Sequence, residues 1–163
     1  MGQAITYITT LQQEAIGTRK ILARVPESQL GWKPHEKSMS LGRLAMHIAE
    51  LPRWIVRSLL STEFDFSKET LQRTTPESQS HILQVFEDNL ANAINALHAT
   101  SDEALSDRWT IRKGPHIIFE FPRKVNIRWT IHHIIHHRGQ LSVYLRLLNV
   151  PLPNLYGPTA DEN

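Results

Sequence analysis

Four of the nine histidines in this 163-residue chain fall within six residues, in the segment IHHIIHH at positions 131–137. They form two pairs at a spacing of four, His132/His136 and His133/His137. In an α-helix this spacing stacks two side chains on one face about one turn apart, so both imidazoles of a pair can reach one metal ion. The chain has no cysteine, so a transition-metal site must use nitrogen and oxygen ligands. The segment therefore predicts a histidine metal site.

Helical geometry separates the two pairs. With a rotation of about 100° per residue, the apolar residues of this segment define a buried direction, and His137 lies roughly 50° and His133 roughly 90° from it. The same geometry places His132 and His136 on nearly the opposite side of the helix. We therefore expect His133 and His137 to border the interior, where helical bundles build their metal sites. The other pair is expected to face solvent or a partner subunit, or to support the site.

A third ligand must come from another part of the chain, and His47 is the best candidate. It lies in the apolar stripe between Leu44 and Leu51, where a polar group is costly unless it has a partner. Glu50 follows within one turn and is expected to act as a carboxylate ligand, as a hydrogen-bond partner of a ligand or as a general base. Tyr144 is expected to contact substrate. Three protein ligands with one open position are typical of catalytic zinc sites, whereas structural sites are usually closed by four.

Each of these features also has a structural interpretation. Histidine pairs at this spacing are often incidental, and a lone core histidine such as His47 is more often hydrogen-bonded to the backbone than bound to metal. The two features together, each on an inward face, favour the metal site. The segment does not match the H-E-x-x-H motif of zincin metalloproteases, because His132 is followed by His133 where that motif needs a glutamate.

Four amphipathic helices are expected to position these residues. Pro26 ends the first, since proline disfavours helix just before itself. Ser38 or Ser40 can cap the second. Thr75 and Pro76 form a typical start of the third, with threonine as the N-cap and proline in the first turn. Apolar periodicity places the helices at about residues 3–23, 38–61, 75–97 and 126–149.

A different pattern separates the last two helices. Residues 109–121 contain two short apolar runs around Gly114-Pro115, which predicts a β-hairpin that must pack on the helices. The tail at 151–158 is proline-rich and expected to be extended. These observations predict a single all-α domain over residues 1–163, a four-helix bundle with a small β-hairpin insert between helices three and four.

Composition narrows the partners. The chain has 18 Lys and Arg against 16 Asp and Glu, and the basic residues are scattered, which does not indicate nucleic-acid binding. No apolar run approaches the ~20 residues needed to span a membrane. The N-terminus lacks the pattern of a secretion signal, so the cytoplasm is the expected location.

Three segments carry a family resemblance. Residues 133–141 with 144–146, residues 38–41 with 44–50, and the tail at 151–162 resemble signatures of the DinB (damage-inducible) family. These segments and the order of the intervening elements cover nearly the whole chain. The resemblance implies a DinB/YfiT-like four-helix bundle with a non-sequential helix connection, often dimeric.

The resemblance also implies a divalent metal ion, typically zinc or nickel, held by three histidines. Carried over to this sequence, these are His47, His133 and His137, the same three that helical geometry selects. Related families include thiol-dependent S-transferases and a mycothiol-dependent isomerase, in which the metal binds and activates a low-molecular-weight thiol.

Two functional hypotheses follow. The first is a metal-dependent transferase or hydrolase that activates a thiol or water for a small-molecule substrate, with Glu50 and Tyr144 assisting, in a homodimer. The second is a non-catalytic, metal-binding stress-response protein, in which the metal stabilises the bundle or a dimer interface. An open metal position beside a pocket would favour the first, and a site closed by a fourth protein ligand would favour the second.

Overall fold

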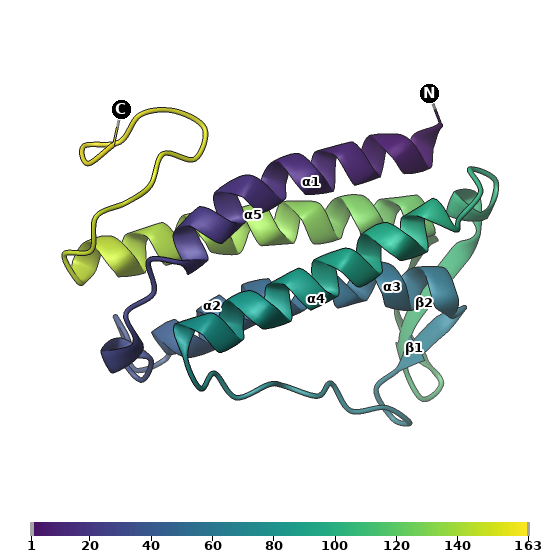
Figure 1. The fold of residues 1–163 in the computed structure, drawn as a ribbon. Helices are drawn as coiled ribbons and strands as arrows, with labels where there is room; N and C mark the ends of the chain where they lie inside the picture. The colour runs from purple at the N-terminus through teal and green to yellow at the C-terminus, as the bar shows by residue number, and fades with distance from the viewer. Residues whose placement is uncertain (1, 163) are drawn as a thin grey trace.

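Four helical rods run side by side in the computed structural model, which describes residues 2–162 (Figure 1). The second rod is broken into two helices, so the described residues form five α-helices. Their bounds are α1 Gln3–Leu22, α2 Leu41–Glu50, α3 Arg53–Leu60, α4 Gln79–His98 and α5 Arg123–Leu147. The short 3₁₀ turns η1 (Glu27–Gln29) and η2 (Ala104–Ser106) lie in the connections. The four-helix bundle expected from the sequence is confirmed.

The break in the second rod corrects the prediction of one continuous helix over 38–61. The Ser40 hydroxyl caps α2 by accepting a hydrogen bond from the Arg43 N–H at 3.2 Å, as one of the two expected caps. The helix then ends at Glu50, because Pro52 has no N–H to donate to the carbonyl of Ile48. The chain resumes helical structure at once as α3.

The start of α4 also differs from the prediction at Thr75 and Pro76. The N-cap is Ser78, whose hydroxyl accepts a hydrogen bond from the His81 N–H at 3.0 Å. The preceding residues are irregular because they are held against α2. A Cβ at Gly42 would lie 2.9 Å from Pro76 Cγ, so only glycine permits this close approach.

A three-stranded sheet lies at one end of the bundle (Figure 1). Strands β2 (Arg108–Lys113) and β3 (His116–Pro122) form the expected antiparallel hairpin, with Gly114 in the left-handed region at φ 56°. Strand β1 (Glu63–Asp65) pairs in parallel with β2 and was not predicted, because three residues are too few for a periodic signal.

The Asp65 carboxylate ties β1 to this hairpin. It accepts hydrogen bonds from the Gly114 N–H at 2.9 Å and from the backbone and hydroxyl of Ser67 at 2.9 and 2.7 Å. These bonds lower the pKa of Asp65 to about 2. The sheet is therefore fixed to the chain that leaves α3.

The packing of the rods is non-sequential, as the resemblance implies. Helix α1 packs mainly on α4 and α5, and the α2–α3 rod also packs on α4 and α5. The first two rods therefore lie diagonally across the bundle. The core between them is mostly aliphatic, with fully buried side chains from every rod. None of the helices described between residues 2 and 162 is long and apolar enough to cross a membrane.

A buried arginine joins α5 to α1 and to the C-terminal tail. The side chain of Arg138 is 2% exposed and forms an ion pair with Glu14 at 2.6 Å. It also donates hydrogen bonds to the Glu14 carbonyl, the Thr18 hydroxyl and the Tyr156 hydroxyl. A Cβ at Gly17 would lie 3.1 Å from Arg138 Nη1, so the small residue gives the guanidinium room. We call these residues the Arg138 anchor.

Candidate metal centre

Helix α2 places three functional side chains on one face. Arg43, His47 and Glu50 follow one another at spacings of four and three residues, which aligns them along one side of the helix. The rest of the α2 surface, beginning with Leu44 and Ile48 next to His47, carries the fully buried residues of the core. Packing of that apolar side fixes the direction in which His47 points.

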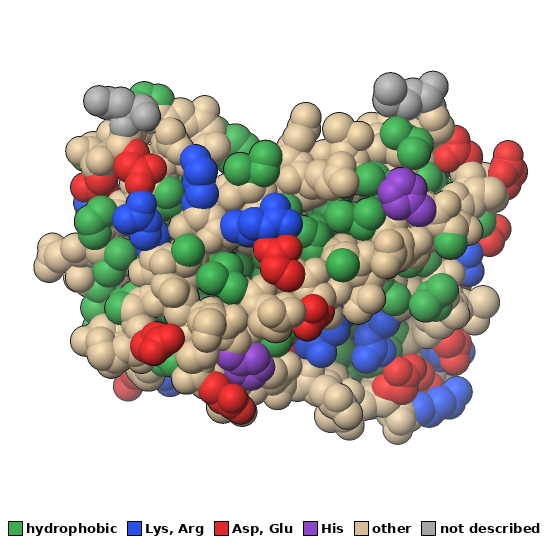
Figure 2. All heavy atoms as spheres, viewed as in Figure 1, with side chains coloured by type: hydrophobic (Ala, Val, Ile, Leu, Met, Phe, Trp, Pro, Cys, Tyr) green, Lys and Arg blue, Asp and Glu red, His purple; other side chains and the backbone are tan. Residues whose placement is uncertain are grey.

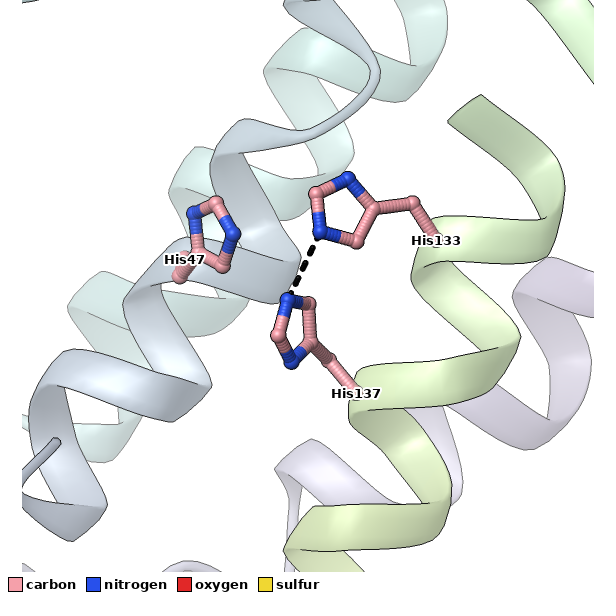
Figure 3. Close-up of side chains that lie close together, drawn as sticks. All are labelled: His47, His133 and His137. Carbon is pink, nitrogen blue, oxygen red and sulfur yellow. Dashed lines mark hydrogen bonds between the residues drawn. The ribbon is translucent and has the colours of Figure 1, made fainter. Parts of the chain in front are cut away.

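Three histidines from two helices converge, as the sequence predicts. His47 comes from α2, and His133 and His137 come from α5 (Figure 3). One ring nitrogen from each lies within 4.8 Å of the other two. The ring centroid of His47 is 5.3 Å from that of His133 and 4.7 Å from that of His137. This is the one group of three or more potential metal ligands found among residues 2–162.

The three rings lie on a gradient from the interior to the surface. His137 is buried, His47 is half-buried and His133 is exposed. Burial, together with the neighbouring imidazoles, lowers the pKa of His47 and of His133 to about 4. Burial also lowers the pKa of His137, against the opposing effect of its hydrogen bond with Gln140. All three imidazoles are therefore neutral at pH 7, which is the state that binds metal.

The hydrogen bonds of His137 indicate its tautomer. Its Nδ1 lies 2.6 Å from the amide oxygen of Gln140, which can only accept, so Nδ1 carries the proton. The lone pair on His137 Nε2 then points at His133 Nε2, which is 2.8 Å away (Figure 3). In proteins, a metal-binding histidine usually donates its other N–H to an oxygen in this way.

This geometry fits a bound metal ion. Imidazole nitrogens bind zinc at about 2.0–2.1 Å, so two such nitrogens on one ion are at most about 4.2 Å apart. The His133–His137 separation is already below that limit, and a modest rotation of one ring brings the third nitrogen, now within 4.8 Å, inside it. The nitrogen-only donor set suits zinc, nickel and related ions. The described residues supply three ligands and no fourth to the group, the number typical of a catalytic site.

The Glu50 carboxylate lies beside this group and is fully engaged. One of its oxygens accepts the Thr74 N–H at 2.7 Å and pairs with Arg53 at 2.7 Å, and the other pairs with Arg43. Burial alone would raise the pKa of Glu50, but the Thr74 and arginine contacts outweigh it and hold this pKa below the ordinary value. The carboxylate is therefore ionised, and its hydrogen bond with Thr74 holds the segment before α4 against α2.

A cavity of about 300 Å³ opens next to His47. Its wall combines apolar side chains with an unusual concentration of arginine. The lining residues come from α2, α3 and the segment before α4, and they are Met39, Arg43, His47, Glu50, Leu51, Arg53, Trp54, Arg57, Leu71, Gln72 and Arg73. The metal centre thus borders a space large enough for a small molecule.

The remaining predicted residues lie around this site. Tyr144 is half-buried and donates a hydrogen bond to the Met39 carbonyl at 3.2 Å, which places it at the edge of the cavity without lining it. His132 and His136 are exposed on α5, as the helical geometry predicted. The His136 ring contacts that of His137, with centroids 5.0 Å apart.

Several residues of the site were missed by sequence reasoning. Gln140 follows His137 by three residues, so the spacing that links one helical turn could have identified it. The spacing from Arg43 to His47 was also readable as one face. Arg73 was not, because its segment has no periodicity that predicts where it packs.

Comparisons with known proteins agree with this fold. A model described as the DinB family matches residues 1–163. The chain is 26% identical over 160 residues to the uncharacterized protein YrdA of Bacillus subtilis (strain 168). The aligned region covers 96% of this chain and 89% of that protein.

Solved structures show the same architecture. A DinB-like protein from Bacillus cereus ATCC 10987 is similar with a TM-score of 0.73 and 23% identity, over 92% of this chain and 95% of that one. A DinB-like protein from Bacillus subtilis, YjoA, has a TM-score of 0.69 and 17% identity, over 92% and 96% of the two chains. At these identities, the similarity establishes the fold alone.

Proposed function

The chain belongs to the DinB family, and from this membership we propose that it is a divalent-metal enzyme whose ion is bound by His47, His133 and His137. The observation that carries the proposal is the convergence of three neutral imidazoles beside a cavity. Zinc or nickel is the proposed ion. When bound, such an ion supplies Lewis acidity, which lowers the pKa of a coordinated thiol or water.

Residues around the histidines have supporting roles in the proposed site. Gln140 fixes the tautomer and orientation of His137 through the 2.6 Å hydrogen bond. Glu50 acts as a positioning residue, because its contacts hold Thr74 and the arginines around the cavity. Acid–base catalysis by Glu50 and substrate contact by Tyr144 stay predictions. The cavity admits a small molecule beside His47 and offers it apolar contact with Met39, Leu51 and Leu71.

We propose transfer of a low-molecular-weight thiol to a small electrophile as the reaction, with hydrolysis as the variant in which water replaces the thiol. The family membership favours the thiol. The alternative, a metal with a purely structural role, predicts a closed site. The exposure of His133 and the adjacent cavity favour an accessible ion instead. A homodimer and a cytoplasmic location stay predictions.

Metal content tests the ligand assignment. We expect purified protein to contain close to one zinc or nickel ion per chain by elemental analysis, and the His47→Ala and His133→Ala variants to lose it. His132→Ala is the matched control, because this exposed residue on α5 lies outside the group. Normal metal content in His133→Ala would refute the three-histidine site.

Activity and stability separate the two roles. The metal-loaded protein and the metal-free His133→Ala variant are screened with common cellular thiols and a chromogenic electrophile, and unfolding of both is followed in urea. Loss of turnover with retained stability supports an enzyme. Unfolding on metal loss, without any turnover by the loaded protein, supports the structural role.

A further inference from the structure

The cavity beside His47 is strongly basic. Four arginines line it against a single carboxylate, Glu50, which leaves a surplus of three positive charges among the lining residues. Counting Glu69, which pairs with Arg57 at 3.0 Å from outside the lining, leaves a surplus of two. The whole chain carries only +2, and Figure 2 shows basic and acidic side chains interspersed over the face viewed there. The charge of the cavity is therefore local.

The four arginines are not equivalent. Arg43 and Arg53 are held by Glu50, and Arg43 also donates to the Thr74 carbonyl at 3.0 Å. The contacts of these two arginines with Glu50 and Thr74 hold the wall of the cavity together. Glu50 neutralises part of that charge and leaves the rest of the cavity without a carboxylate.

Arg73 supplies unpaired charge, and Arg57 supplies charge that it shares with Glu69. Arg57 is about one-third exposed, and its guanidinium lies 4.6 Å from the ring centroid of Phe64, so it is held in place with Glu69 as one partner. Arg73 is exposed and has no ion pair or side-chain hydrogen bond to any residue between 2 and 162. An unpaired guanidinium at the wall of a cavity is a ready donor for a bidentate carboxylate or phosphate.

Apolar side chains complete the wall. Met39, Leu51, Trp54 and Leu71 also line the cavity. Together they offer apolar contact to an organic body, while the arginines offer charge to one end of it. A space of about 300 Å³ is at the lower end for small-molecule pockets, which span roughly 300–1,000 Å³.

We propose that the substrate held in this cavity is a small organic anion, whose negatively charged group binds to Arg57 and Arg73 while its apolar body lies against Trp54, beside His47. That the bound anion is a substrate rests on the proposed function. The preference of the cavity for an anion depends only on the residues that line it. The shared chemistry is a planar or tetrahedral oxyanion, either a carboxylate or a phosphate ester.

Matched probes test the charge preference. Benzoate and benzamide have the same shape and differ in charge, and phenyl phosphate presents the alternative oxyanion. Binding of each to the purified full-length protein is measured by titration calorimetry. We expect benzoate or phenyl phosphate to bind at least about tenfold more tightly than benzamide, as one charge-assisted hydrogen bond allows. The tighter of the two anions identifies the oxyanion class.

Variants assign the preference to the cavity. We expect Arg73→Gln and Arg57→Gln each to weaken anion binding by about tenfold and to leave benzamide binding unchanged, and Arg73→Lys to restore part of the loss. Arg128→Gln is the control, because it removes one exposed arginine of α5 that does not line the cavity. Binding of both benzoate and phenyl phosphate no tighter than that of benzamide, or equal losses in Arg128→Gln and Arg73→Gln, would overturn the proposal.

The same titration in His133→Ala keeps this result separate from the metal proposal. We expect the anion preference to persist in the variant, because Arg57 and Arg73 are unaffected. If the wild-type protein contains no metal but still prefers the anion, the cavity inference holds and the proposed enzyme fails. If metal binds and the preference is absent or disappears in His133→Ala, the cavity inference fails and the metal site stands.

Discussion

Two adjacent residues of α5 face different neighbouring rods of the bundle and end in very different surroundings. His137 points to α2 and the metal centre, and Arg138 points to α1 and the tail. The guanidinium of Arg138 is surrounded by acceptors from Glu14, Thr18 and Tyr156. The imidazole of His137 has one oxygen partner, Gln140, and otherwise faces another histidine nitrogen.

The difference separates a polar network that is closed within the chain from a cluster that fits an added metal ion. In the Arg138 anchor every charge has its partner within the chain, and such a closed polar network rigidifies its surroundings. In the metal centre three imidazole nitrogens converge on one another, and the group contains no carboxylate. The first arrangement is complete without an added group, whereas the proposed metal ion would complete the second.

The largest expected effect is that of the substitution Arg138→Met. Removing one member of a buried ion pair leaves the Glu14 carboxylate uncompensated and costs about 3–5 kcal/mol of unfolding free energy. Urea unfolding measures the loss. We expect the folded fraction to keep its metal content. The double variant Glu14→Gln/Arg138→Met is the control and should recover part of the stability. A loss below about 1 kcal/mol would mean that the pair behaves like one on the surface.

On the other side of the helix, Gln140→Leu should affect ligand binding and leave folding intact. Loss of a hydrogen-bond partner of a metal-binding histidine lowers affinity by about 10–100-fold. Gln140 is exposed, so the unfolding free energy of the metal-free chain should not change. Competition with a chromogenic chelator measures the affinity, and Ser142→Ala on the same helix is the control. Unchanged affinity would show that Gln140 does not orient His137.

A smaller effect is expected at the edge of the anchor. Tyr156→Phe removes a hydroxyl that donates to Glu14 at 2.7 Å and accepts from Arg138. Because Tyr156 is 72% exposed, water can replace part of the contact, and we expect a loss of about 1 kcal/mol. Urea unfolding at pH 7 measures it. A loss as large as that of Arg138→Met would mean that most of the stability provided by the Arg138 anchor comes from its contact with the tail.

A pH dependence of stability is expected on the metal-centre side only. The pKa values of His47 and His133 are about 4 in the folded chain, and an unfolded imidazole titrates near ~6.5. The unfolded state therefore binds more protons below pH 6.5, and this contribution to stability, fully present above that pH, is lost as the pH falls towards 4.

Unfolding in chelator at pH 7 and pH 5 measures this slope before the carboxylates of the unfolded chain become protonated. We expect stability to decrease towards pH 5, less so in His47→Asn, and by the wild-type amount in Tyr156→Phe. Parallel slopes in wild type and His47→Asn would contradict the neutral imidazole at position 47.

Periodicity explains why so much of the fold and of the metal centre was predictable. The phase of α5 separates His133 from His132 because an apolar stripe defines which side is buried, and the same argument places His47 inward on α2. Periodicity does not predict the rest of the fold. Pro52 interrupts a stripe that continues across it. The start of α4 is displaced because Glu50 binds Thr74, a contact between residues 24 positions apart.

The basic cavity could not be predicted for a similar reason. Arg43, Arg53 and Arg57 resemble solvent-facing helix residues in the sequence. They line one space because the segment before α4 folds back over them, bringing Arg73 with it. No periodic pattern in residues 66–78 records that placement.

That irregular segment shapes the cavity wall independently of the three histidines. Leu71, Gln72 and Arg73 form part of the cavity wall, but the three histidines stand on α2 and α5 and are positioned by core packing. Insertions, deletions or substitutions between residues 66 and 73 can thus reshape the cavity without moving any of the three histidines. Related chains could diverge in the shape of this cavity through this stretch alone, while retaining the same histidine cluster.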